Sequence, residues 1–182
     1  MGPIIVLVVL ALLVVFAIGV FNNIVSLENR VANALGQIDV QLKKRSDLVP
    51  NLVSTVKGYA THETSVFEKV TAARSKLDNA TGVEEKAAAS SMLSGALRTV
   101  FAVAEAYPDL KANQNFIQLQ SELAELEDKI AYSRQFYNDT ALEFNNSITT
   151  VPGVFFASPM NKTKKSMFEA SEGEKAVPAV SF

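Results

Sequence analysis

The amino-terminal segment of the chain carries no charged side chain, and this limits what the chain can fold into. No Asp, Glu, Lys or Arg occurs from Gly2 to Phe21, and Ile4–Val20 is almost entirely Ile, Val, Leu, Ala and Phe. As an α-helix, Ile4–Phe21 would be about 27 Å long, close to the ~30 Å hydrocarbon core of a bilayer. The sequence therefore predicts a transmembrane anchor over residues 1–21.

A cleaved signal peptide is the alternative for the same segment. Such a peptide needs a basic amino-terminal region, and Met1-Gly2-Pro3 provides none beyond the α-amino group. Ala17-Ile18-Gly19 does satisfy the small-x-small rule of a cleavage site. The missing basic region and the length of the apolar run favour the retained anchor.

Positive charge near the apolar segment gives an orientation. No Lys or Arg precedes it, Arg30 follows it, and the cluster Lys43-Lys44-Arg45 lies just beyond the usual window of the positive-inside rule. This distribution favours a cytoplasmic carboxyl side.

Helical periodicity dominates residues 22–150. Apolar residues from Phe21 to Leu42 recur every three or four positions, with neither Pro nor a run of Gly to interrupt them. We expect this helix to end near Lys43-Lys44-Arg45, and a second helix to begin at the capping residues Ser46 or Asp47 with Pro50 in its first turn. The second helix should end near Asp78, and two more are predicted over 83–106 and 110–148. The fold class is therefore all-α, a transmembrane helix continuing into a long antiparallel bundle of about four helices.

The last part of the chain, residues 151–182, is predicted to be an irregular tail that packs on the bundle or on the membrane. It combines apolar side chains with lysines, as segments at the membrane interface do. The candidate interface residues are Phe155, Phe156, Lys162, Lys164, Lys165 and Phe168. The alternative is that the phenylalanines fold back onto the open end of the bundle.

Residues that could carry out chemistry are scarce. The chain has no Cys and a single histidine, His62, and no H-E-x-x-H, G-x-S-x-G or glycine-rich phosphate-binding motif occurs. The clusters of Glu and Asp are typical of solvated helix faces, and the basic cluster at 43–45 lacks the interleaved aromatic residues of a nucleic-acid site. We therefore predict no catalytic residue, no cofactor, no metal, no nucleic-acid partner and no enzymatic activity.

Several runs of the sequence resemble one known family. The resemblance is carried by Arg30–Ala34, Gln37–Arg45, Asp47–Val53, Val56–Ala60 with His62-Glu63, Ala72–Arg74, Ser133–Asn138 with Asn145-Asn146, Phe168–Ala170 and Val177–Phe182. On these residues the chain is similar to the LemA family over essentially its whole length. The resemblance implies a single-pass protein of the bacterial inner membrane with a helical bundle, and it implies no catalytic activity.

The polar residues of these runs form the candidate site. We expect them around the first inter-helix turn, where they either tie the adjoining helices together or form a partner surface. They are Asn33, Gln37, Asp39, Arg45, Asp47 and Asn51.

The function predicted from the sequence is that of a non-enzymatic, membrane-anchored helical scaffold that self-associates into a homo-oligomer at the bacterial membrane. Its partners would be the lipid bilayer and further copies of itself. An adaptor that binds another membrane or signalling protein is the alternative. An enzyme with a cryptic carboxylate or metal site is the third hypothesis.

Overall fold

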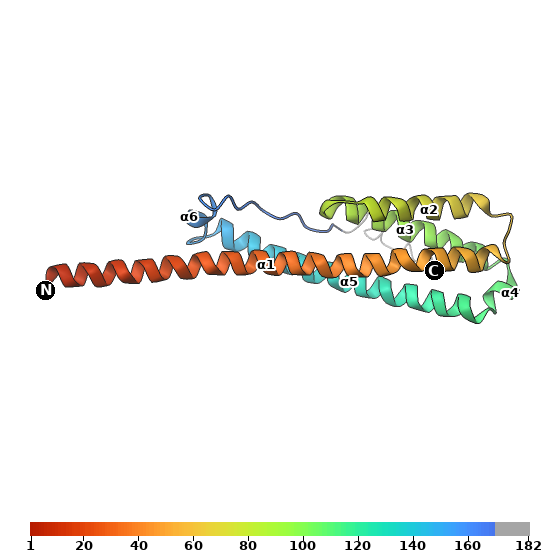
Figure 1. The fold of residues 1–182 in the computed structure, drawn as a ribbon, viewed down its shortest axis with the longest axis horizontal. Coiled ribbons are helices and arrows are strands. Elements are labelled where there is room, and N and C mark those ends of the chain that lie inside the picture. Colours follow the sequence, from red (N-terminus) through yellow and green to blue (C-terminus); the bar gives the residue numbers. More distant parts are fainter. Residues whose placement is uncertain (170–182) are drawn as a thin grey trace, which may run out of the picture. The chain divides into compact units, whose positions relative to one another are not determined.

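A computed structural model describes residues 1–169, and helices account for most of them. The elements are α1 (Gly2–Lys57), α2 (Thr64–Asn79), α3 (Gly82–Ala104), α4 (Pro108–Lys111), α5 (Gln114–Thr149) and α6 (Val154–Ala157) (Figure 1). No strand occurs in this described part, so the prediction of an all-α protein is confirmed there. The expected character of the tail beyond Glu169 concerns residues outside it.

Helix α1 runs unbroken for 56 residues, which corresponds to about 84 Å. Its amino-terminal part has a mean hydropathy of 3.5 and buries none of its residues in the protein. The helix is thus long and apolar enough to cross a membrane. Helix α3, with a mean hydropathy of 1.3, is also long and apolar enough by these two measures, but it is partly buried and packs against α2.

The predicted helix boundary near residue 45 is wrong. Helix α1 continues past Lys43-Lys44-Arg45 and carries Pro50 in its interior. The reason is the buried stripe of α1, which keeps its spacing of three and four residues through the predicted boundary. The packing of this stripe along a continuous helix outweighs the helix-start signals of Ser46, Asp47 and Pro50. The members of the stripe are Ile24, Leu27, Val31, Ala34, Ile38, Leu42, Arg45, Ser46, Val49, Leu52 and Val56.

Pro50 is tolerated because its ring lies on the exposed side of α1. An interior proline costs about 3 kcal/mol, mainly through one lost hydrogen bond and a clash one turn earlier. The chain turns instead at 58–63, so the single helix predicted from Ser46 to Asp78 is divided between α1 and α2. The predictions for α3 and α5 agree with the structure to within a few residues at each end.

The chain divides into two compact units. Unit 1 consists of Met1–Gly36 and Gln135–Ser166, and unit 2 of Gln37–Arg134 with the residues from Met167 on. In unit 2, α2 and α3 follow one another through a short connection and lie side by side (Figure 1). Gly82 opens α3 at a φ of 79°, a left-handed conformation that only glycine adopts without strain. The Glu85 side chain accepts a hydrogen bond from the Thr81 backbone N–H, which closes this turn and lowers the Glu85 pKa.

In unit 1 the buried residues of α1 and α5 form the core, together with Ala157 of α6. The segment after α6 is held in place by side chains of α5, which form hydrogen bonds with its backbone. The Asn145 side-chain amide donates to the Lys165 carbonyl at 2.9 Å and its oxygen accepts from the Lys165 N–H at 2.7 Å, while the Tyr137 hydroxyl donates to the Ser166 carbonyl. An otherwise irregular segment is thereby held along the helix.

Gly153 allows the turn after α5 to fold back closely on that helix. A Cβ at this position would lie 1.8 Å from the Ser147 carbonyl oxygen, which is a backbone atom and cannot move aside. We therefore expect Gly153→Ala to lower the free energy of unfolding by about 1–3 kcal/mol, as overpacking does. Circular dichroism during thermal unfolding in mild detergent would measure the loss.

Gly36→Ala provides the matched control for that measurement. Gly36 lies in α1, and an added Cβ would meet nothing within 4 Å. This change should leave the protein as stable as before or raise its stability by about 0.5–1 kcal/mol, because Ala favours helix interiors. Equal stability of Gly153→Ala and the unchanged protein would contradict the proposed role of the close approach.

Candidate functional site

The six polar candidate residues all lie on α1, and none of them lies at a turn. The expectation that they surround the first inter-helix turn is therefore wrong, because that turn is at residues 58–63. The structure separates them by burial. Arg45 is buried and Asp39 is half-buried, while the others are exposed: Asn33, Gln37, Asp47 and Asn51.

Arg45 is a buried cation that connects three helices of unit 2. Its side chain is 4% exposed, and its Nη2 donates to Ser94 Oγ on α3 at 3.0 Å and forms an ion pair with Glu127 Oε2 on α5 at 2.8 Å. Burial lowers the Arg45 pKa, and the nearby Glu127 carboxylate acts in the opposite direction. The Nε and Nη1 atoms of Arg45 have no hydrogen-bond partner. Glu127 is thus the one carboxylate paired with this buried charge within residues 1–169.

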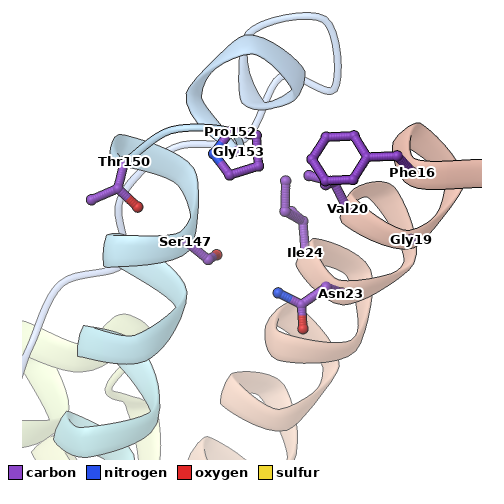
Figure 2. A pocket seen from close by; sticks show the side chains of 9 residues that line it. All are labelled: Phe16, Gly19, Val20, Asn23, Ile24, Ser147, Thr150, Pro152 and Gly153. Atoms are coloured by element: carbon purple, nitrogen blue, oxygen red, sulfur yellow. The ribbon is translucent and has the colours of Figure 1, made fainter. Parts of the chain in front are cut away.

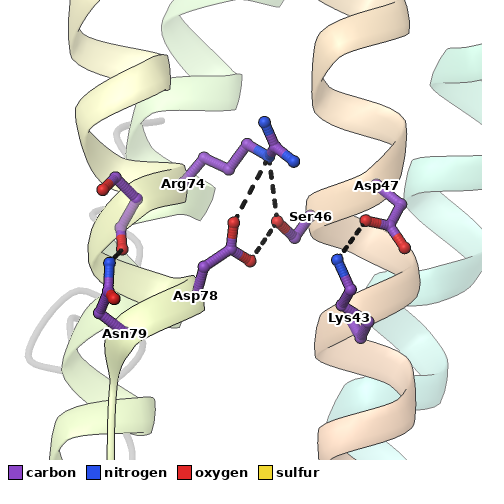
Figure 3. Close-up of polar contacts among 7 residues, drawn as sticks. Lys43, Ser46, Asp47, Arg74, Asp78 and Asn79 are labelled. Carbon is purple, nitrogen blue, oxygen red and sulfur yellow. Dashed lines mark hydrogen bonds and ion pairs between the residues drawn. The ribbon is translucent and has the colours of Figure 1, made fainter.

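Ser46 joins α1 to α2 through a second polar network (Figure 3). The Ser46 hydroxyl donates to Asp78 Oδ1 at 2.6 Å, and Arg74 Nε donates to the same hydroxyl oxygen at 3.2 Å. Ser46 is fully buried, so each partner satisfies a group that has no access to water. This role was missed because Ser46 has the sequence features of a helix cap. The signal that identifies it is its spacing from Leu42 and Val49, which places it on the buried stripe.

Asp39 also makes an inter-helix contact. Its carboxylate pairs with Lys86 of α3 at 2.5 Å, and the Lys86 side chain is 17% exposed. Asp47, in contrast, pairs at 2.5 Å only with Lys43 one turn away on the same helix, where both side chains are more than half exposed (Figure 3). Two aspartates with the same predicted role therefore have different surroundings, since one connects helices and the other faces solvent.

One exposed face of α1 in unit 2 shows near-heptad spacing. Five exposed residues, separated by three and four positions, form what we call the exposed α1 stripe: Gln37, Val40, Lys44, Asp47 and Asn51. Asn33 precedes Gln37 by one further turn of the same helix. Val40 is 52% exposed and is the one apolar side chain of the stripe.

The membrane-interface candidates of the tail have different surroundings. Phe155 is 72% exposed, Phe156 is half-buried and Lys164 is exposed. Lys162 and Lys165 both pair with Glu28 of α1, at 2.5 and 3.2 Å. Phe168 belongs to unit 2, where it is 6% exposed beneath the Arg134 guanidinium, and it contributes no exposed apolar surface.

Glu28 is the first charged residue of the chain, and its carboxylate is partly sheltered from solvent. The hydrogen bond from Lys162 lowers the Glu28 pKa below its ordinary value of 4.5, partial burial opposes this, and Lys165 lowers it further. The Lys165 ammonium also lies 5.4 Å from the centre of the Phe144 ring. The pair of lysines thus attaches the segment after α6 to α1 within unit 1.

No metal site is found among the described residues. No group of three or more His, Asp and Glu side chains there is placed to hold an ion, and His62 is exposed in the connection between α1 and α2. The buried and half-buried polar residues of unit 2 described above connect neighbouring helices.

Comparison with known proteins decides the family. The sequence profile of the LemA family matches residues 34–182. The chain belongs to the LemA family. The matched region begins after the apolar segment of α1 and includes five of the six candidate polar residues.

Individual relatives agree with this assignment. The chain is 31% identical to Protein LemA of Metamycoplasma hominis, over 87% of this chain and 73% of that protein. It is 24% identical to the magnetosome proteins MamQ 1 and MamQ 2 of Paramagnetospirillum magneticum, over 75% of this chain and 60% of each relative. The chain therefore spans less than two thirds of the length of the two magnetosome proteins.

The Arg45–Glu127 pair predicts an asymmetric response to mutation. Glu127→Ala leaves a buried guanidinium without its carboxylate and should cost about 3 kcal/mol of unfolding free energy. Arg45→Met removes the buried charge together with its unpaired donors and leaves Glu127, which is 42% exposed, in contact with water. It should therefore cost less, about 1 kcal/mol.

Denaturant unfolding of both variants and of the double variant would measure this asymmetry. The double variant should be no less stable than Arg45→Met alone, because without the buried Arg45 charge the Glu127 carboxylate no longer contributes to stability. Asp47→Ala is the control, since an exposed pair contributes about 0–1 kcal/mol. A greater loss for Arg45→Met than for Glu127→Ala would contradict the interpretation.

Glu28 predicts a pH-dependent contribution to stability. Because its pKa is lower in the folded protein than in the unfolded chain, the stabilisation is present above pH 4.5 and is lost as the pH falls through the folded-state pKa. Glu28→Gln should lower the unfolding free energy at pH 7 by about 1 kcal/mol. The difference from the unchanged protein should shrink as the pH falls from 4.5 through the folded-state pKa, as followed by thermal unfolding at several pH values. A difference that stays constant with pH would exclude the ion pairs as its cause.

Proposed function

We propose that the protein is a non-enzymatic, membrane-anchored scaffold that self-associates into a homo-oligomer at the bacterial inner membrane. The observation that carries this proposal is the unbroken course of α1, which connects the apolar segment to the exposed α1 stripe through one continuous helix.

Membrane association is supported by the exposed apolar surface at the start of α1. In Ile4–Val15 the large apolar side chains are 49–66% exposed, far more than an aqueous surface helix tolerates. A bilayer removes this surface from water and leaves every backbone hydrogen bond intact within the helix. We propose a single-pass topology with a cytoplasmic carboxyl side.

We further propose that the helices of residues 22–150 form one long antiparallel bundle, with residues 1–21 as its anchor and 151–182 as its tail. The inter-helix contacts of Arg45, Ser46 and Asp39 support this arrangement within unit 2.

Self-association through the exposed α1 stripe would use the spacing that helices use when they pair. Residues separated alternately by three and four positions lie on one seam, and polar residues within such a seam select register and partner. Lys44 and Asp47 supply both signs of charge, so an antiparallel copy could pair Lys44 with Asp47. The candidate polar residues Gln37, Asp47 and Asn51 then act as a partner surface, and Asp39 and Arg45 act within the unit.

The adaptor hypothesis uses the same surface for a different membrane or signalling protein. Relatives named for different settings, Protein LemA and magnetosome proteins, share the sequence pattern and fit either a scaffold or an adaptor. The two hypotheses differ in whether purified protein assembles alone.

Mass measurement in lipid discs tests the proposal. The intact protein at micromolar concentration should give a homo-oligomer by light scattering. Val40→Glu should raise the dissociation constant at least tenfold, because it places a charge at the one apolar position of the stripe. Ile117→Glu is the matched control, since Ile117 is 51% exposed on α5 outside the stripe. A monomer in discs would contradict self-association and favour the adaptor.

A further inference from the structure

A groove opens beside the end of the apolar segment in unit 1 (Figure 2). It has a volume of about 420 Å³. One wall comes from α1, and the other comes from the end of α5 and the turn that follows. The lining residues are Phe16, Gly19, Val20, Asn23, Ile24, Ser147, Thr150, Pro152 and Gly153. A volume of this size lies within the ~300–1,000 Å³ range of sites for small molecules.

The α1 wall of the groove is apolar and has an open position in it. Phe16, Val20 and Ile24 project from successive turns of α1, as Figure 2 shows. Gly19 lies between them, and a Cβ added there would meet nothing within 4 Å. The wall therefore offers a smooth apolar surface with room beside the helix backbone.

The polar groups of the groove differ in what they can still bind. The Ser147 hydroxyl donates to the Phe144 carbonyl and the Thr150 hydroxyl donates to the Asn146 carbonyl, so both protons are in use. The Asn23 amide donates no hydrogen bond to another side chain or carbonyl of residues 1–169, and it lies two residues after the apolar segment ends. Asn23 is exposed, and its amide is the side-chain donor of the groove that remains available to a ligand.

The depth of the groove follows from its α1 wall. Phe16, Gly19 and Val20 belong to the segment that lies in the bilayer if α1 is inserted, and Asn23 lies about 4 Å further along the helix axis than Val20. The groove then extends from the hydrocarbon edge to the level of the lipid ester groups. The chain next to Pro152 and Gly153 also carries exposed apolar side chains, since Val151 and Phe155 are 73% and 72% exposed.

We propose that this groove binds one phospholipid molecule of the bilayer, with an acyl chain along Phe16, Gly19 and Val20 and an ester carbonyl accepting a hydrogen bond from Asn23. The proposal rests on the membrane anchor proposed above. Lipid is the solvent at this depth, so any other occupant would first have to displace it. The polar and apolar groups of the groove also occur in the order in which a phospholipid presents its ester groups and chains.

Photolabelling in lipid discs tests the proposal. The probe is phosphatidylethanolamine with a diazirine near the carboxyl end of one acyl chain, at a few per cent of the lipid. Trypsin cleaves after Arg134 and Lys162, so the wall formed by residues 147–153 is recovered in one peptide and α1 up to Arg30 in another. We expect label on both peptides, including residues 147–153.

Gly19→Leu fills the groove, and its effect identifies specific binding. This variant should reduce labelling of the 135–162 peptide at least fivefold and leave labelling of residues 4–15 unchanged. Gly36→Leu is the matched control, because Gly36 also lies in α1 with open space around it and outside the groove. It should label like the unchanged protein.

Three outcomes would overturn the lipid site. They are label confined to α1, equal labelling of the 135–162 peptide in both variants, and crosslinks from a photoreactive residue at Val20 to a second copy in place of lipid. Vesicle flotation separates these failures from failure of the anchor. If the protein does not float with vesicles, the membrane anchor itself is wrong, whereas normal flotation without groove labelling contradicts the lipid site alone.

Discussion

The structure depends on one requirement, that the backbone of α1 satisfy its hydrogen bonds internally along its whole length. In the bilayer proposed above no water can bind a free N–H or carbonyl group, so the apolar segment must be helical there. Beyond it the helix continues because a buried stripe with steps of three and four residues runs to Val56. Under that proposal, lipid favours the helix at one end and side-chain packing favours it at the other.

The polar contacts of unit 2 show how its part of α1 is held in register with the neighbouring helices. Ser46 and Arg45 lie on the buried stripe, and each connects α1 to other helices through directional bonds. An apolar stripe alone permits sliding by one turn, because leucine and valine side chains are nearly interchangeable along it. A buried guanidinium that finds one carboxylate, and a buried hydroxyl that bonds to Asp78, each permit one alignment. We therefore regard these contacts as devices of specificity more than of stability.

Much of the fold follows from the sequence, and the failures have a common cause. The all-helical class, the apolar helical start of α1 and the ranges of α3 and α5 could be predicted, since each rests on a long continuous or periodic apolar pattern. The boundary at residue 45 could not, because Ser46, Asp47 and Pro50 are local signals that a stripe of tertiary contacts outweighs. Asp39 and Asp47 were predicted to share one role for the same reason, because tertiary contacts that local patterns do not reveal set them apart. Only the positions of Lys86 and Lys43 distinguish an inter-helix tie from a surface pair.

The position of Glu28 suggests how the tail and the membrane are related. It lies seven residues beyond Phe21, or about 10 Å along α1, which in the proposed topology places it just outside the hydrocarbon core, near the headgroup level. A lone carboxylate there would repel anionic headgroups, but the two ammonium groups of Lys162 and Lys165 outweigh its charge. The same ion pairs hold the segment after α6 beside α1 in unit 1, on the part of the helix next to the groove. Under the proposed topology, this cluster of three charges therefore compensates the first carboxylate of α1 and keeps the segment that follows Phe155 close to the lipid headgroups.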